Sequence, residues 1–202
     1  MARATSTITA AALGYLVGSI PSSDIVSRIA THGQVDLHTE GSANPGALNA
    51  AKVLGTRWGM VVLAADVAKG AAAGVIGRLI GGDNSAYAAA TTAIAGHIAP
   101  PWSRFRGGKG VATSAGACLA VFPAYFPIDL AVAGASAARS QRADRATEIA
   151  CLVWLASALV WWRAKLPNLW GPKPGPGLAA FAAVGSGMIL WKFRSAAHRA
   201  SA

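Results

Sequence analysis

Charged side chains are scarce in this sequence, and acidic ones are the scarcest. Only 13% of the 202 residues are charged, with 8 Asp or Glu against 18 Lys or Arg, whereas 53% are hydrophobic. A soluble domain of this length hides its core behind a charged shell. This chain has too few charges for such a shell, and its mean hydropathy is +0.42. The composition therefore predicts an integral membrane protein.

Cysteine is also rare, and the sequence contains no metal-ligand spacing. The two cysteines, Cys118 and Cys151, lie inside apolar stretches. Isolated cysteines in apolar segments are typical of small buried packing residues. We therefore expect no metal and no cofactor.

The excess of basic residues gives a formal charge of +10 and a pI near 10.5. Such a charge can indicate nucleic-acid binding. The basic residues here lie at the ends of apolar segments, where the positive-inside rule places them. We therefore expect no nucleic-acid partner, and we expect membrane lipid and anionic substrates instead.

Long apolar runs predict an all-α, polytopic transmembrane helix bundle forming one domain over residues 1–202. We expect about seven short spans, at Thr7 to Ile29, Trp58 to Ile80, Ala86 to Trp102, Val111 to Phe122, Ala124 to Ala138, Ile149 to Arg163 and Leu178 to Trp191. A crossing needs roughly 20 apolar residues. The fourth and fifth segments, hinged at Pro123, are shorter, so one bent span or a shallow hairpin is the alternative and the count is five to seven.

The distribution of Lys and Arg predicts the orientation of the bundle. With seven alternating spans, most Lys and Arg residues outside the spans fall in one set of loops. The richer set is expected at the cytoplasmic face of the cell membrane. This places the N-terminus outside, the C-terminus in the cytoplasm, and the loops 30–57, 103–110 and 139–147 together at the inner surface.

Two loops at that face carry residues suited to anions. The first contains Gly41, Ser42, Asn44, Gly46 and Asn49, followed by Lys52. Small residues, a hydroxyl and two amides let the backbone turn and aim donors at one anion. An ordinary turn has the same composition, and the residues alone leave both interpretations open.

The second loop runs over residues 104–113 and opens directly into an apolar span. It contains three glycines around a lysine, flanked by Arg106 and Thr113: Gly107, Gly108, Lys109 and Gly110. Amide groups at a helix N-terminus, the helix dipole and a lysine charge together favour an anion. The loop is not a Walker motif, because Gly110 follows the lysine where Ser or Thr is required. We favour an anion site over a simple basic flank.

Of the ionisable residues within the predicted spans, we single out Asp66, Lys69 and His97. Asp66 and Lys69 are three residues apart on one predicted helix, and His97 lies near the end of the third span. Ionisable groups in membrane segments are costly and mark functional sites by default. The alternatives are a structural Asp66–Lys69 ion pair and an interfacial position for His97.

Five ordered pieces of the sequence resemble the bacterial membrane acyl-phosphate:glycerol-3-phosphate acyltransferase family of the Y type. The pieces are Gly18-Ser19-Ile20-Pro21, Gly41-Ser42-x-Asn44-x-Gly46-x-x-Asn49, Asp66-x-x-Lys69-Gly70, Gly96-His97, and Phe105-x-Gly107-Gly108-Lys109-Gly110-Val111-Ala112-Thr113. The resemblance implies acyl transfer from acyl phosphate to glycerol 3-phosphate, giving lysophosphatidate, without a classical catalytic base. Its implied partners are those two substrates and membrane lipid, and it leaves the oligomeric state open.

Fourteen candidate site residues follow from the residue patterns and the resemblance together. The residues expected to be catalytic are Ser42, Lys109 and His97. Those expected to bind substrate or phosphate are Asn44, Gly46, Asn49, Lys52, Asp66, Lys69, Arg106, Gly107, Gly108, Gly110 and Thr113. Lys52 stands where the family has arginine. The family's third motif, His-Arg-Glu-Asn, is missing, and residues 192–197 read Lys-Phe-Arg-Ser-Ala-Ala instead.

Two alternatives to this function remain at the level of the sequence. One is a divergent relative that acylates another polyol phosphate or serves as an inactive partner subunit. The other is a small anion transporter, which needs ionisable residues spread through both halves of its spans. The ionisable residues here cluster at one face, which favours the acyltransferase.

Overall fold

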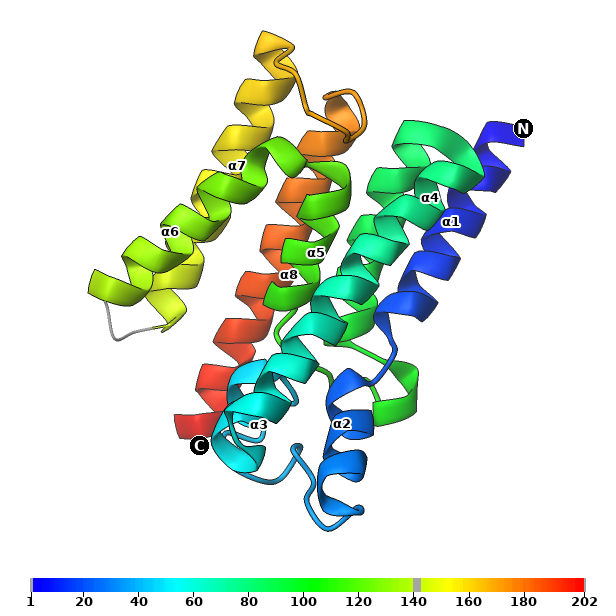
Figure 1. Cartoon of the computed structure of the whole chain (residues 1–202). Coiled ribbons are helices and arrows are strands. Elements are labelled where there is room, and N and C mark those ends of the chain that lie inside the picture. The colour runs from blue at the N-terminus through cyan, green and yellow to red at the C-terminus, as the bar shows by residue number, and fades with distance from the viewer. Residues whose placement is uncertain (1, 140–142, 202) are drawn as a thin grey trace.

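The computed structural model describes residues 2–139 and 143–201, and the regular elements in those ranges are all helices (Figure 1). The α-helices are α1 (Ala2–Gly18), α2 (Ser22–Thr31), α3 (Ala47–Leu54), α4 (Thr56–Ile98), α5 (Val111–Val121), α6 (Phe126–Arg139), α7 (Ala143–Ala164) and α8 (Pro176–Ser201). Two 3₁₀ turns are η1 (Pro101–Ser103) and η2 (Pro123–Tyr125). The predicted all-α class is confirmed.

Three helices of the described ranges are long and apolar enough to cross a membrane. They cover Thr56–Ser103, Arg145–Ala164 and Pro176–Ala196. A fourth span results if Val111–Val121 and Pro123–Val132, which meet at 117°, count as one bent crossing. The hinge predicted at Pro123 is therefore confirmed.

α4 folds back on itself at a pair of glycines. The backbone leaves the helical conformation at Gly81 and at Gly82, where φ is 75°. A side chain is strained at that φ, so glycine is the residue suited to the reversal. A Cβ on Gly77 would lie 2.6 Å from the Cβ of Ala89, twelve residues further on. The two arms of α4 therefore pack closely side by side (Figure 1).

Small residues allow α1 to lie directly against the second arm of α4. A Cβ on Gly14 would be 2.3 Å from the Ala89 carbonyl oxygen, and one on Gly18 would be 2.1 Å from that of Ala93. Glycines four residues apart on one helix face let two membrane helices approach at backbone distance. This contact fixes the end of α1 beside the end of α4.

The first predicted span, Thr7 to Ile29, is wrong as a single helix. The chain leaves the helix after Gly18 and starts α2 at Ser22. Pro21 lacks an N–H donor and so interrupts the helical hydrogen bonds. The break exposes the Ile20 carbonyl, which accepts a hydrogen bond from Lys69 Nζ at 2.9 Å.

The predicted loop 30–57 is also wrong in part, because it contains α3. A small apolar cluster explains its position: Val26 of α2, Leu37, Ala50 of α3 and Val62 of α4 are buried together. Packing of an apolar face stabilises so short a helix, which is marginal in isolation. This cluster holds the first loop and α2 at the end of the bundle where the C-terminus lies, opposite the N-terminus (Figure 1).

A larger aromatic cluster joins the remaining helices. Trp154 of α7 and Phe181 of α8 meet edge to face with ring centroids 5.0 Å apart. Phe122 and Tyr125 stack at the bend between α5 and α6. Aromatic pairs in these geometries add to the stabilisation from burial.

Candidate functional site

A small pocket lies where the break after α1, both arms of α4 and the glycine-rich loop converge. We call it the inner pocket. It encloses about 20 Å³, which is room for one water-sized group. It is lined by Gly18, Ser19, Ile20, Pro21, Ser22, Ser23, Asp24, His38, Pro45, Asp66, Lys69, His97, Pro100, Ser103, Arg106, Gly107 and Gly108.

A buried cluster of ionisable side chains forms one wall of the inner pocket. Asp66 Oδ1 lies 2.9 Å from Lys69 Nζ and 3.5 Å from His97 Nδ1, and all three side chains are almost fully buried. The spacing predicted the Asp66–Lys69 pair, and the structure adds His97 from the other arm of α4. Buried charges persist when they are paired. Lys69 also holds the Ile20 carbonyl at the helix break.

The glycine loop packs onto this cluster so closely that side chains have no room. A Cβ on Gly107 would lie 2.0 Å from the His97 carbonyl oxygen, and one on Gly108 would lie 2.3 Å from His97 Nε2. The Gly107 N–H donates to the Ile98 carbonyl at 3.0 Å. Glycine is therefore required for the loop to reach the imidazole.

We expect Gly108→Ala to move this loop and to lower the free energy of unfolding by about 1–3 kcal/mol, because the added methyl meets the His97 ring and the Pro45 carbonyl. Thermal unfolding of the purified protein measures the change. Gly187→Ala in α8 is the control, since a Cβ there meets no atom within 4 Å. Equal melting temperatures for the two variants would contradict the packing argument.

The start of α5 adds further predicted residues beside the loop. Gly110 precedes the helix with a φ of 87°, in the left-handed region that favours glycine. Thr113 is fully buried, and among the residues that the structure describes its Oγ1 has no hydrogen-bond partner. Lys109 Nζ lies 4.2 Å from the centroid of the Phe193 ring. Gly110, Thr113 and Lys109 do not line the inner pocket.

The first loop meets the glycine loop. A Cβ on Gly108 would lie 2.9 Å from the Pro45 carbonyl oxygen, and Pro45 lines the inner pocket. The expectation that the two loops lie within reach of one another is therefore confirmed. Ser42 is exposed and Asn44 is half-buried, and neither lines the inner pocket.

Asn49 has a different task from the predicted phosphate binding. Its side chain is buried, and its Oδ1 accepts the Ser42 N–H at 2.8 Å. Its Nδ2 donates to the carbonyl groups of Leu37 and Glu40 at 3.2 and 3.0 Å. Because the side-chain amide of Asn49 makes its hydrogen bonds to the loop backbone, Asn49 stabilises the loop that carries Ser42.

We expect Asn49→Ala to lower the free energy of unfolding by about 2 kcal/mol, because three backbone partners lose their hydrogen bonds. Thermal unfolding is again the measurement. Asn44→Ala in the same loop is the matched control, with an expected loss below about 0.5 kcal/mol. If both variants melt alike, Asn49 does not hold the loop.

Two further predicted residues lie outside the inner pocket. Gly46 precedes α3, and its carbonyl accepts the Ala50 N–H at 2.9 Å. Lys52 is exposed in the last turn of α3, where its charge favours the helix dipole. It is a helical residue and not the loop residue that the sequence predicted.

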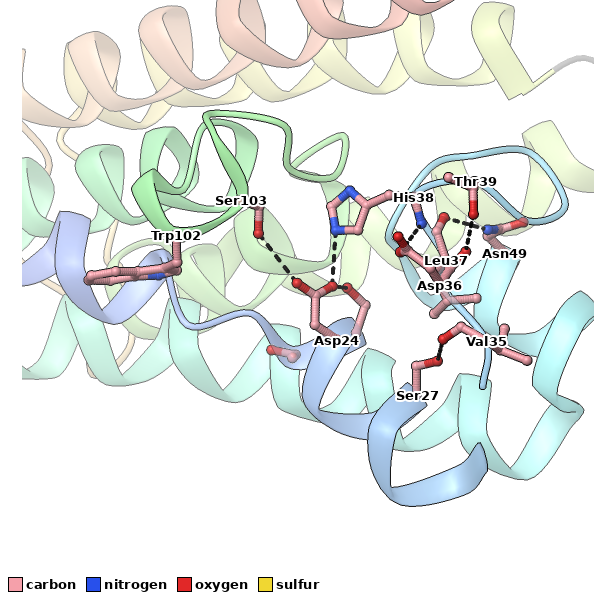
Figure 2. A network of polar contacts seen from close by, with 12 residues as sticks. Asp24, Ser27, Val35, Asp36, Leu37, His38, Thr39, Asn49, Trp102 and Ser103 are labelled. Carbon is pink, nitrogen blue, oxygen red and sulfur yellow. Dashed lines mark hydrogen bonds and ion pairs between the residues drawn. The ribbon is translucent and has the colours of Figure 1, made fainter. Parts of the chain in front are cut away.

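Asp24 and His38 are pocket residues that the sequence analysis missed. Figure 2 shows the Asp24 carboxylate between three segments: Oδ1 lies 3.1 Å from His38 Nε2, Oδ2 accepts the Ser103 hydroxyl at 3.3 Å, and Ser23 donates from within α2. Trp102 Nε1 donates to the Ser19 carbonyl nearby. The polar run Ser22-Ser23-Asp24 after Pro21 was the available signal, since it interrupts an apolar segment.

The segment that replaces the third motif also reaches the site. Lys192 of α8 is buried and its Nζ donates to the Ile98 carbonyl at 3.3 Å. The Phe193 ring forms a cation–π contact with the Lys109 ammonium. Arg194 instead lies in an exposed ion pair with Glu148 at 3.9 Å. Residues 192 and 193 therefore contact the glycine loop and the helix end before it.

Known proteins similar to this chain share one activity in their names. The chain matches the family model described as glycerol-3-phosphate acyltransferase over residues 8–202. The glycerol-3-phosphate acyltransferase of Nitrobacter winogradskyi is 46% identical over 111 residues, 55% of this chain and 56% of that protein. That of Exiguobacterium sibiricum is 42% identical over 114 residues, 56% of this chain and 54% of that protein. The chain thus spans less than two thirds of these relatives' own lengths.

A solved structure shares the fold over a longer stretch. The crystal structure of PlsY (YgiH), an integral membrane glycerol 3-phosphate acyltransferase in its glycerol 3-phosphate form, superposes with a TM-score of 0.77 at 26% identity. The match covers 96% of this chain and 91% of that one. Because the family model also covers residues 8–202, this protein belongs to the glycerol-3-phosphate acyltransferase family.

Proposed function

We propose that this chain transfers an acyl chain from acyl phosphate to the 1-hydroxyl of glycerol 3-phosphate, giving lysophosphatidate and inorganic phosphate. The observation that carries the proposal is the meeting of the first loop and the glycine loop beside the inner pocket. The two loops hold two of the five pieces by which the chain resembles the family, and the relatives named above are glycerol-3-phosphate acyltransferases.

The reaction needs little covalent chemistry from the protein. The hydroxyl oxygen attacks the carbonyl carbon of the acyl phosphate, the bond from that carbon to the phosphate oxygen breaks, and phosphate leaves with the hydroxyl proton. Because the acyl phosphate is already activated, positioning the two substrates and neutralising phosphate charge supply much of the acceleration.

The residues divide between binding and positioning in this proposal. Lys109 and the amides of the glycine loop hold the phosphate of the donor at the start of α5. The Ser42 hydroxyl contacts substrate from the first loop, whose backbone Asn49 fixes. His97 acts through the glycine loop that packs on its imidazole, and Asp66 holds that imidazole.

We extend the proposal to the orientation of the protein: seven crossings, with the N-terminus outside and the site at the cytoplasmic face of the cell membrane. Figure 1 supports it, since the site loops and the C-terminus lie at one end of the bundle and the N-terminus at the other. Arg28 lies in α2, and Arg104, Arg106 and Lys109 lie in the loop between η1 and α5, where the positive-inside rule places basic residues of a cytoplasmic face. Labelling of Ser42→Cys by a membrane-impermeant thiol reagent added outside intact cells would contradict this orientation. The native Cys118 and Cys151 are buried, so the label reports on position 42.

The test of the function is an assay of phosphate release by the purified protein with acyl phosphate and glycerol 3-phosphate. We expect release that requires both substrates, and lysophosphatidate as the product. Acyl-CoA and acyl carrier protein loaded with the same chain are the comparison donors, and we expect no transfer from either. Turnover only with another polyol phosphate would assign a different acceptor, and no turnover with any pair would refute the proposal.

A further inference from the structure

The two loops of the proposed site contain backbone conformations that their own residues disfavour. Ala43 in the first loop has a φ of 52°, and Arg104 and Phe105 at the start of the glycine loop have φ values of 51° and 60°. Such conformations cost free energy for residues other than glycine and persist where their surroundings hold them. The contacts that hold these loops are therefore part of how the site is built.

Asp24, in the first turn of α2, contacts a segment next to each loop. Figure 2 shows its carboxylate between His38 and Ser103. Oδ1 lies 3.1 Å from His38 Nε2, and Oδ2 accepts the Ser103 hydroxyl at 3.3 Å. His38 precedes the first loop, and Ser103 is the last residue of η1, directly before the glycine loop. One carboxylate thus joins the two loops to α2.

His38 belongs to the same hydrogen-bonded unit as Ser42. Asn49 Nδ2 donates to the carbonyl groups of Leu37 and Glu40 at 3.2 and 3.0 Å, on either side of His38. Asn49 Oδ1 accepts the Ser42 N–H at 2.8 Å. Because one side chain holds residues 37, 40 and 42 together, a displacement of His38 displaces Ser42 as well.

Ser103 is connected in the same way to the glycine loop. Its carbonyl accepts the Arg106 N–H at 2.9 Å, and the Gly107 N–H donates to the Ile98 carbonyl at 3.0 Å. Lys109 follows two residues after Gly107. The backbone between η1 and Lys109 is therefore held from both ends, and a shift of Ser103 moves the start of the glycine loop.

The simplest alternative role for Asp24 is to stabilise α2 alone, as an acidic residue in the first turn of a helix. That role requires neither His38 nor Ser103, yet each carboxylate oxygen has a partner from another segment. The Asp24 and His38 side chains are 28% and 23% exposed. Ion pairs that are partly open to solvent contribute little to folding stability, so we look for the effect of Asp24 in the geometry of the site.

We propose that Asp24 is a positioning residue for acyl transfer, which holds the first loop and the glycine loop in register through His38 and Ser103. This inference rests on the proposed function, in which Ser42 and Lys109 contact the same pair of substrates. Asp24 acts through its two neighbours and not on the reacting atoms. Misplacement of a substrate-holding group by about 1 Å can slow a reaction by about 100-fold, so a contact that adds little stability can still control turnover.

The first experiment measures kcat and both KM values for phosphate release by the full chain in phosphatidylcholine nanodiscs. We expect Asp24→Ala to lower kcat by about tenfold, with each KM within about threefold of the parent and the melting temperature within about 2 °C. Asp24→Asn keeps the shape and an oxygen acceptor for Ser103, and it is expected to recover kcat to within about threefold of the parent.

Each result that would overturn the proposal is distinct. Parent-like kcat in Asp24→Ala would show that the loops do not depend on this residue. A kcat in Asp24→Asn as low as in Asp24→Ala would show that the negative charge itself is needed, and a loss confined to one KM would make Asp24 a binding residue. Asp83→Ala is the matched control, since Asp83 is a half-exposed carboxylate paired with Arg78, and it is expected to leave kcat unchanged.

A double-mutant cycle tests the link to each loop. His38→Ala and Ser103→Ala are each expected to lower kcat by about threefold in the parent and to have no further effect in Asp24→Ala, because they act through the same carboxylate. Equal losses in both backgrounds would mean that these residues act independently of Asp24, and would overturn the proposal.

A distance measurement separates this inference from the proposed function. Spin labels at Glu40→Cys and Arg104→Cys report the separation of the two loops, because both positions are exposed and the native cysteines are buried. We expect a narrow distance distribution in the parent and in Asp83→Ala, and a broader one in Asp24→Ala. A parent without turnover that shows this broadening would refute the proposed function alone. A parent that turns over, with the same distribution and kcat in Asp24→Ala, would refute the positioning role alone.

Discussion

Lys109→Ala is expected to slow acyl transfer at low substrate by about 100-fold while the melting temperature stays near that of the parent. Lys109 stands between Gly108 and Gly110 at the start of α5, where helix N–H groups and dipole also favour an anion. A charge-assisted contact to substrate phosphate contributes about 2–3 kcal/mol. The assay is phosphate release over a range of acyl phosphate concentrations.

Two comparisons make that result specific. Lys173→Ala removes an exposed lysine from the loop before α8 and is expected to leave turnover unchanged. Phe193→Leu retains the Lys109 charge but removes the ring beneath it, with an expected loss of about threefold from a cation–π contact of roughly 0.5–1 kcal/mol. Near-normal turnover by Lys109→Ala would remove this lysine from the proposed site.

Asp66→Asn is expected to lower the free energy of unfolding by about 3–5 kcal/mol, the largest stability loss among the changes considered. Asp66 is buried between Lys69 and His97, and its removal leaves the Lys69 ammonium without its carboxylate partner. Removing one partner of a buried ion pair lowers the free energy of unfolding by about 3–5 kcal/mol, because the remaining charge is buried without a partner. Thermal unfolding in detergent and in nanodiscs gives the measurement.

The double variant Asp66→Asn/Lys69→Met is expected to recover part of the loss, since it removes both charges. Asp83→Asn supplies the contrast: Asp83 and Arg78 form a half-exposed pair at 3.6 Å, and exposed pairs contribute about 0–1 kcal/mol. If Asp66→Asn melts like Asp83→Asn, the buried cluster is not what holds the helix break against α4.

Several features of the fold follow from local sequence alone. The membrane class follows from composition, the helices follow from long apolar runs, and the bend at Pro123 follows from proline chemistry. The Asp66–Lys69 pair follows from a spacing of three residues on one helix. The interruption after Gly18 has the same local cause as the bend, and the prediction missed it because the run after Pro21 remains partly apolar.

The two anion loops were recognisable from the sequence because the glycines that their backbones require occur within a few positions of one another. Gly107 and Gly108 were predicted as parts of a cradle, and the structure gives the packing reason, the contact with His97. The role of Asn49 was mistaken for a related reason. An amide that binds a ligand and an amide that binds its own loop have the same sequence signature.

The sequence by itself determined the elements of this protein and the chemistry of its loops, because both depend on residues within a few positions of one another. Tertiary structure alone decided which elements share a site. Ser103 meets Asp24 across 79 residues, Lys69 reaches Ile20 across 49, and Phe193 lies beneath Lys109. Such contacts depend on how the helices pack, and this packing depends on the small residues of α1 and on the reversal of α4. A local sequence pattern does not specify which helices will lie against one another.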